Sequence, residues 1–130
     1  MKKLTLILTL LVSTVMFSSP SFAKWTSVGT GVKGDTFYVD FDRIRKHDGY
    51  VYFWDMTDNL KPIDGDLSGS SYIQGDCKLF RHKSLSFSFY KQPMGRGPAQ
   101  VLKPHKEVQG WQYPSPNSIS EVILKSVCSH

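Results

Sequence analysis

The chain has 130 residues, with 16 basic and 11 acidic side chains and a formal net charge of +5. This length suits one domain, and a mild positive charge spread along the chain does not indicate a nucleic-acid-binding protein. The core of so small a domain is marginal, so a covalent crosslink would help to stabilise it.

The first 23 residues have the three parts of a secretory signal peptide. Residues 1–3 are a short basic start, residues 4–17 form an apolar run, and Ser21 and Ala23 are small residues at the −3 and −1 positions of a cleavage site. A membrane anchor is the alternative, but the run is shorter than the roughly 20 residues of a bilayer span, and no stop-transfer pattern follows. Cleavage would leave a mature domain, residues 24–130, with 14 basic and 11 acidic side chains and a net charge of +3.

We therefore expect an exported protein, located in the periplasm, on the cell surface or outside a Gram-negative bacterium. No membrane span is expected once the signal is removed. No cysteine follows the apolar run, so no lipid-attachment site is present there.

Six segments have the alternating or aromatic pattern of β-strands. In 36–41 every second residue is apolar, and in 78–90 serines alternate with large apolar residues, which predicts a half-buried strand with a solvent-facing row of serines. The segment 50–56 is apolar on both faces, which predicts a central strand covered on both sides. The predicted strands are 25–29, 36–41, 50–56, 70–76, 78–90 and 99–102.

Turn-forming residues separate these strands. We predict a single helical turn at 42–45 and a tight turn at Asp48-Gly49. Residues 57–69 and 92–98 are rich in Gly, Pro, Asp and Ser, and both are predicted to be loops.

The first predicted loop contains part of a calcium-binding pattern. Asp64, Asp66 and Ser68 match its first three ligand positions, and Gly69 matches the glycine that follows them. The last ligand position falls on Gly75 instead of Glu, and no helices flank the segment. An ordinary turn is the favoured interpretation, and whether residues 64–69 bind calcium stays open.

The last segment, 116–128, is predicted to be an amphipathic helix. Ser118 and Glu121 form a capping box, which satisfies free amide groups in the first turn of a helix. Cys128 lies at the edge of the apolar stripe. This stripe consists of Ile119, Val122, Ile123 and Val127.

The two cysteines, Cys77 and Cys128, form an even pair in an exported chain, so a disulfide is the default expectation. A redox or metal pair is the alternative, but there is no Cys-x-x-Cys and no histidine at ligand spacing from either cysteine. We predict an α+β fold, an antiparallel sheet of about five to six strands with one C-terminal helix packed on one face and tied to it by the disulfide.

No constellation of catalytic or metal-binding residues is visible. The histidines are scattered, none is part of a metal-binding motif, and no Gly-x-Ser-x-Gly is present. We therefore predict a protein that is not an enzyme and that has no cofactor and no metal, with a small hydrolase as the remaining alternative.

Four basic residues lie close to aromatic residues in the sequence and are the candidate binding residues. They could form a basic, aromatic surface for an anionic polymer or a protein partner. The alternative is a core face with solvated charges beside it, because alternation alone produces the same pattern. The four residues are Arg81, Lys83, Lys91 and Arg96.

Several residues in a fixed order resemble the surface-adhesin protein E-like family of small exported bacterial proteins, over nearly the whole mature chain. They are Trp25, Tyr38-Val39-Asp40 with Ile44, Tyr52-Phe53-Trp54, Ser71, Asp76-Cys77 with Arg81, the segment 90–97, Trp111, and the tail Pro114-x-Pro116-x-Ser118 leading to Cys128. The resemblance implies an antiparallel sheet joined to a C-terminal helix by a disulfide. It also implies adhesion, because the founding member binds host matrix and serum proteins such as vitronectin, laminin and plasminogen.

We expect a non-enzymatic exported binding domain whose partner is a protein or a polyanionic surface, and not a nucleic acid. A periplasmic accessory or inhibitor module that binds another envelope protein is the alternative. The oligomeric state stays open, a dimer included.

Overall fold

The computed structural model describes residues 23–130, so the predicted signal peptide, except for Ala23, lies outside the described residues. The strands are β1 (Thr26–Thr30), β2 (Thr36–Val39), β3 (Arg45–His47), β4 (Tyr50–Ile63), β5 (Asp66–Asp76), β6 (Arg81–Tyr90) and β7 (Ala99–Leu102). Within residues 23–130 the helices are three short 3-10 turns, η1 (Phe41–Arg43), η2 (Pro93–Gly95) and η3 (Lys106–Val108), and one α-helix, α2 (Ile119–Cys128).

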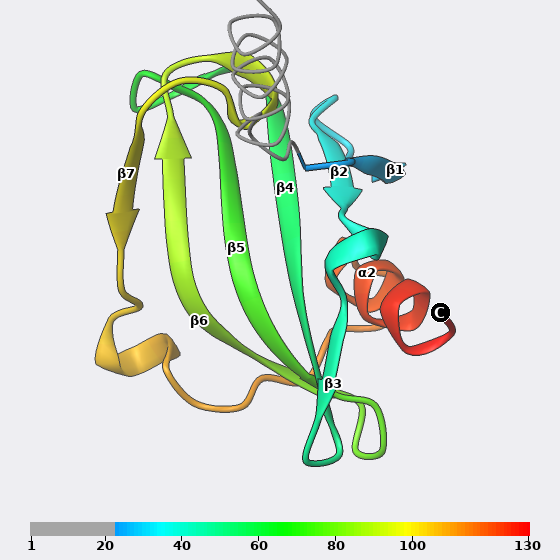
Figure 1. Ribbon diagram of the computed structural model, residues 1–130. Helices are drawn as coiled ribbons and strands as arrows, with labels where there is room; N and C mark the ends of the chain where they lie inside the picture. Colours follow the sequence, from blue (N-terminus) through cyan, green and yellow to red (C-terminus); the bar gives the residue numbers. More distant parts are fainter. Residues whose placement is uncertain (1–22) are drawn as a thin grey trace, which may run out of the picture.

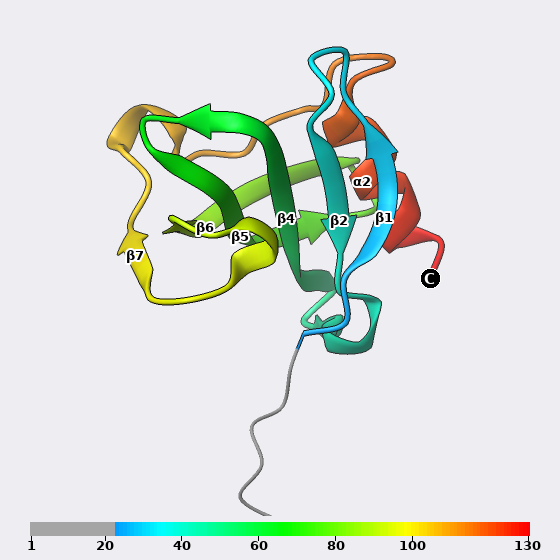
Figure 2. The same ribbon diagram turned by 90° about the horizontal axis from the view of Figure 1, so that it is seen from above.

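All the strands join one antiparallel sheet in the order β1-β2-β4-β5-β6-β7, and the short β3 pairs with the start of β4. The helix α2 lies beside the β1, β2 and β4 end of the sheet, and β7 lies at the other end (Figures 1 and 2). The predicted α+β class, the C-terminal helix and its packing on one face are confirmed. The strand β3 was not predicted, because Arg45–His47 is exposed and carries no apolar alternation.

The predicted loop 57–69 is wrong, because β4 and β5 form one long hairpin there. β4 continues to Ile63, β5 begins at Asp66, and only Asp64 and Gly65 form the turn, with φ of 50° and 81°. Both values suit a two-residue hairpin turn, for which Asp-Gly is a preferred sequence. Polar residues fill this part of both strands because it extends beyond the core, and that composition resembles a loop.

The hairpin also removes the basis for a calcium loop. The Asp66 carboxylate lies 2.9 Å from the Nζ atom of Lys91, and the Ser68 hydroxyl donates a hydrogen bond to the carbonyl of Gln92 at 2.6 Å. Both oxygens belong to residues of a strand and are already bonded to Lys91 and Gln92 of the same chain. Within residues 23–130 no group of three or more His, Cys, Asp or Glu side chains is placed to hold a metal ion.

The core lies between α2 and the sheet face that we call the helix face. Burying each of its large apolar side chains stabilises the fold by roughly 1.5–3 kcal/mol. The buried core consists of Val39, Val51, Phe53, Ile73, Ile123, Leu124 and Val127.

The orientation of α2 differs slightly from the predicted stripe. Leu124 is 1% exposed, whereas Val122 is 39% exposed. The reason lies in the sheet, because β5 has Gly75 below Leu124. A Cβ atom on Gly75 would lie 3.1 Å from Leu124 Cδ1 and 2.8 Å from Val51 Cγ2. Because Gly75 has no side chain, Leu124 can pack closely against β5 in the core.

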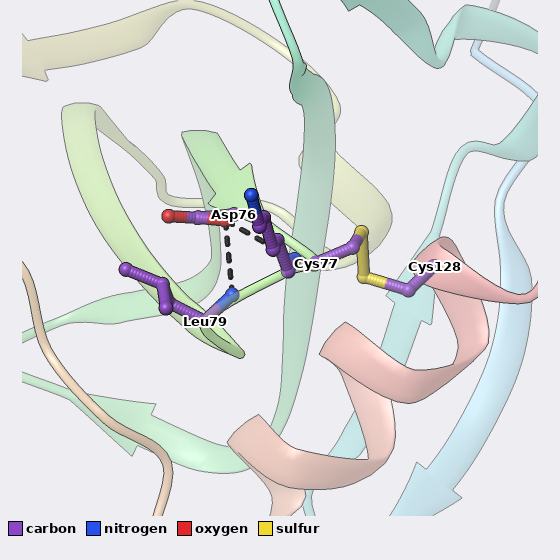
Figure 3. The surroundings of a disulfide bond; sticks show 5 residues. Asp76, Cys77, Leu79 and Cys128 are labelled. Carbon is purple, nitrogen blue, oxygen red and sulfur yellow. Dashed lines mark hydrogen bonds between the residues drawn. A yellow bond between two sulfur atoms is a disulfide. The ribbon is translucent and has the colours of Figure 1, made fainter.

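Both ends of α2 are held as the sequence predicts. The Ser118 hydroxyl accepts a hydrogen bond from the Glu121 amide at 3.2 Å, and Glu121 Oε1 accepts one from the Asn117 amide at 3.3 Å. At the other end, Cys128 forms the predicted disulfide with Cys77, with 5.7 Å between the Cα atoms (Figure 3). The disulfide joins the last turn of α2 to the turn that follows β5.

Asp76 shapes the turn that carries Cys77. Its Oδ1 atom accepts hydrogen bonds from the amides of Lys78 and Leu79, each at 3.1 Å (Figure 3). These bonds, the Leu79 amide foremost, together with the Arg81 guanidinium, hold the pKa of Asp76 below its usual value. Asp76 is therefore an ionised carboxylate, and its hydrogen bonds hold the turn that contains Cys77 in place.

Candidate binding surface

The sheet face opposite α2 carries a series of aromatic rings. Trp54 on β4 and Tyr72 on β5 are direct cross-strand partners, with ring centroids 4.8 Å apart, and Tyr52 lies 6.3 Å from Tyr72. Because side chains alternate along a strand, these rings lie opposite Phe53 and Ile73 of the core. We call this surface the aromatic face. Its rings are Trp25, Tyr50, Tyr52, Trp54, Tyr72 and Trp111, and all of them are partly exposed.

Arg43 joins two of these rings on the β2 side. Its guanidinium lies 5.8 Å from the ring centroid of Trp25 and 5.4 Å from that of Trp54. Its Nε atom donates to Asp40 Oδ2 at 2.6 Å, and the buried Asp40 also caps η1 by accepting from the Asp42 amide. The helical turn was predicted at 42–45 and lies at Phe41–Arg43, because Arg45 begins β3. This turn places Arg43, whose side chain remains 43% exposed and keeps part of its charge in solvent.

Arg81 and Lys83 meet at the opposite end of β4 and β5. The Arg81 guanidinium lies 4.3 Å and the Lys83 ammonium 4.6 Å from the ring centroid of Trp111, which also packs 5.5 Å from Tyr50. Backbone hydrogen bonds between His82 and Gln112 hold the Trp111 segment against β6. The structure therefore brings two of the four candidate residues onto one ring.

Arg81 is also paired with an acid. Its Nε atom lies 2.9 Å from Asp76 Oδ2, and this hydrogen bond is the main reason why the pKa of Arg81 is raised. Lys83 forms no ion pair within residues 23–130, so its charge is the more available of the two.

Lys91 and Arg96 lie near the other end of β6 and do not join the first pair. Lys91 is paired with Asp66, and Arg96 lines a surface cavity of about 600 Å³ together with Trp25 and Met94. The four candidates therefore form two separated groups, one at each end of the aromatic face. The ring partner of the first group is Trp111, and not the neighbouring Phe87 and Phe89 of β6.

The loop that carries Arg96 packs onto the sheet at this end. The Gly95 amide donates to the Ser68 hydroxyl and the Met94 amide donates to Asp58 Oδ1, each at 2.8 Å. This packing buries Ser68 and Ser70 of β5 and Ser88 of β6.

The predicted solvent-facing row of serines is thus wrong. Besides the burial of Ser88, Ser86 pairs with Tyr72 but Ser84 pairs with Ile73, so an extra residue, Leu85, interrupts the alternation of β6. Ser84 consequently lies on the helix face.

The sequence contained a signal for the aromatic face, but the four candidate binding residues did not include it. Tyr50, Tyr52 and Trp54 alternate on one side of β4, whereas Arg43 and Trp25 are far apart in the sequence and meet only through the sheet. Rings and guanidinium groups that are already ordered can stack on planar groups and pair with carboxylate, sulfate or phosphate groups.

The fold and this surface define a small α+β protein in which a disulfide fastens one C-terminal helix to an antiparallel sheet. No helix within residues 23–130 is long and apolar enough to cross a membrane. The family model described as surface-adhesin protein E matches residues 25–129, and the chain belongs to this family.

Solved structures agree with this assignment. The chain is similar to the structure of Haemophilus influenzae protein E, with 15% identity, a TM-score of 0.63, and coverage of 86% of this chain and 90% of that one. Protein E from non-typeable Haemophilus influenzae matches at 16% identity and a TM-score of 0.61, over 85% of this chain and 80% of the other. At this identity the likeness shows the fold alone. The comparison with curated proteins finds no match.

By family, the chain is a surface-adhesin-like protein. The predicted signal peptide and export are consistent with that membership.

Proposed function

We propose that the mature chain, residues 24–130, is an exported, non-enzymatic binding protein that holds a protein or a polyanionic surface against its aromatic face. The observation that carries this proposal is the ordered stacking of cations on rings at both sides of the face. Arg43 stacks between Trp25 and Trp54 on one side. Arg81 and Lys83 stack on Trp111 at the other.

The physical argument is that these residue types dominate binding energy when they are ordered before binding. Trp, Tyr and Arg are enriched among interface residues whose truncation costs most. The guanidinium groups of Arg43 and Arg81, already fixed by Asp40 and Asp76, lose little conformational entropy on association. The charges would attract acidic groups over the range of a Debye length, which is about 8 Å at physiological salt.

Host matrix or serum proteins are the first class of partner to test, because the family is one of adhesins. An accessory or inhibitor module that binds another envelope protein is the second function. One observation favours it: the chain has only two cysteines and both form the disulfide, which leaves none for lipid attachment at the surface. Cell fractionation separates the two, because a purely periplasmic protein cannot adhere directly to a host.

The binding experiment uses residues 24–130 against immobilised matrix proteins, a sulfated polysaccharide and extracts of the cell envelope. The double variant Trp54→Ala, Lys83→Ala should bind at least tenfold more weakly while circular dichroism shows it folded. Lys103→Ala, an exposed lysine after β7, is the matched control and should bind normally. Unchanged binding by the double variant, or no binding by the parent chain to any of these partners, would contradict the proposal.

A further inference from the structure

A small polar cavity of about 130 Å³ lies between the helix face of the sheet and α2, apart from the aromatic face. Five polar side chains from three strands and the helix line it, over a floor of core residues that includes Phe53 and Leu124. The polar side chains are those of Asp55, Ser71, His82, Ser84 and Ser120.

Local structure directs each polar group to this place. Asp55 and Ser71 are direct cross-strand partners on β4 and β5. The extra residue in β6 turns Ser84 toward the helix, and Ser120 comes from the first turn of α2. All five residues are partly buried, and the cavity that they line is open to solvent.

These groups cost stability where apolar residues would serve the fold better. Burial raises the pKa of Asp55 to about 7, although hydrogen bonds from Ser71 act in the other direction. The Nδ1 atom of His82 is buried and has no hydrogen-bond partner among residues 23–130, and burial lowers the pKa of this imidazole. A buried polar atom without a partner lowers the stability of the fold. A ligand that supplies the missing partners accounts for both features.

We propose that this cavity binds a small primary ammonium ion with a short carbon body, of the size of ethanolammonium. The ionised Asp55 carboxylate supplies the counter-charge and accepts one of the three hydrogen bonds of the ammonium group. The neutral His82 imidazole, in its Nε2–H tautomer, accepts the second at Nδ1, and a serine hydroxyl accepts the third. Phe53 and Leu124 contact the carbon body.

The size of the cavity sets the class of ligand. A cavity of about 150 Å³ accommodates benzene, so about 130 Å³ suits a ligand of roughly six heavy atoms or fewer. No Lys or Arg lines the cavity, so an anion of the same size would face the Asp55 carboxylate without a counter-charge. A ligand of four heavy atoms should bind no more tightly than on the order of tens of micromolar.

The test is a titration of isotope-labelled residues 24–130 with ethanolammonium chloride, followed by NMR at the Asp55 carboxyl carbon and the His82 ring. Equal concentrations of sodium chloride serve as the salt control. Saturable shifts at both residues are expected. Binding should be about tenfold tighter at pH 8 than at pH 6, because the ionised fraction of a carboxyl with a pKa near 7 rises about tenfold over that range.

Asp55→Asn keeps the shape of the side chain and removes its charge, so it should weaken binding at least tenfold and abolish the pH dependence. Asp64→Asn, in the exposed hairpin turn, makes the same chemical change elsewhere and should bind as the parent chain does. Absence of saturable shifts at the cavity would overturn the proposal, as would unchanged binding by Asp55→Asn. Equal affinity for ethylene glycol would overturn the assignment to an ammonium ion.

Discussion

Asp55→Asn should make the protein more stable at pH 8, although it removes a side chain that hydrogen-bonds to Ser71. The folded protein binds a proton at Asp55 with a pKa of about 7, against an ordinary value of 3.8. A raised folded-state pKa means that this carboxyl contributes most stability below about pH 4. That contribution is lost as the pH rises toward and through 7.

The magnitude follows from the same two values. A shift of about three pKa units corresponds to about 4 kcal/mol at about 1.4 kcal/mol per unit, which is the upper limit of the effect. Asp55 keeps some solvent contact, so a gain of about 1–3 kcal/mol is expected at pH 8. Near pH 4 the carboxyl is protonated in the folded state and only about half ionised in the unfolded state, so the variant and the parent should be nearly equal.

Urea denaturation of residues 24–130 with the disulfide intact, followed by tryptophan fluorescence from pH 4 to pH 8, measures this difference. Asp64→Asn is the control and should change the free energy of unfolding by less than about 0.5 kcal/mol at any pH, as exposed substitutions usually do. If Asp55→Asn is equally or less stable than the parent at pH 8, the buried ionised carboxylate does not destabilise the fold, and the reasoning on the cavity is refuted.

Three further variants test the attachment of α2, each by the same urea denaturation. Gly75→Ala should cost about 1–3 kcal/mol, because the new Cβ would lie 2.8 Å from Val51 Cγ2; a neutral effect would contradict the close packing. The double variant Cys77→Ser, Cys128→Ser should lower the free energy of unfolding by about 4 kcal/mol. Any loss of partner binding should occur only to the extent that the variant unfolds. A folded variant that no longer binds would contradict a purely structural role of the disulfide. Ser118→Ala should cost about 1 kcal/mol, and no change would show that the cap contributes nothing.

The sequence predicted most of the fold because its strongest patterns coincide with the core. The alternation in 36–41, the apolar run 50–56 and the capped helix with Cys128 all correspond to elements in contact with one another. The hairpin between β4 and β5 was missed although Asp64-Gly65 is a preferred hairpin-turn sequence, because its outer half packs on no core and therefore carries no apolar alternation. Register was the second limit, since the extra residue Leu85 in β6 leaves no clear mark in the sequence.

The candidate surface was predicted only in part. Arg81 and Lys83 share one ring, as a basic, aromatic surface requires, but that ring is Trp111, some 30 residues away in the sequence. Arg43 was missed because its partners, Trp25 and Trp54, come together only when β1, β2 and β4 pair. The cavity around Asp55 was missed for the same reason, since a single acidic residue in a strand gives no sign that it faces a helix.

The claim that the aromatic face binds the partner is tested most directly by site-specific photo-crosslinking in the exporting cells and on their target surfaces. A photoreactive phenylalanine derivative would replace Tyr52 on the aromatic face and, separately, Lys125 on the exposed side of α2. We expect a discrete adduct from position 52 and none from position 125. Adducts from position 125 alone, or from neither position under conditions where the parent protein binds, would contradict it.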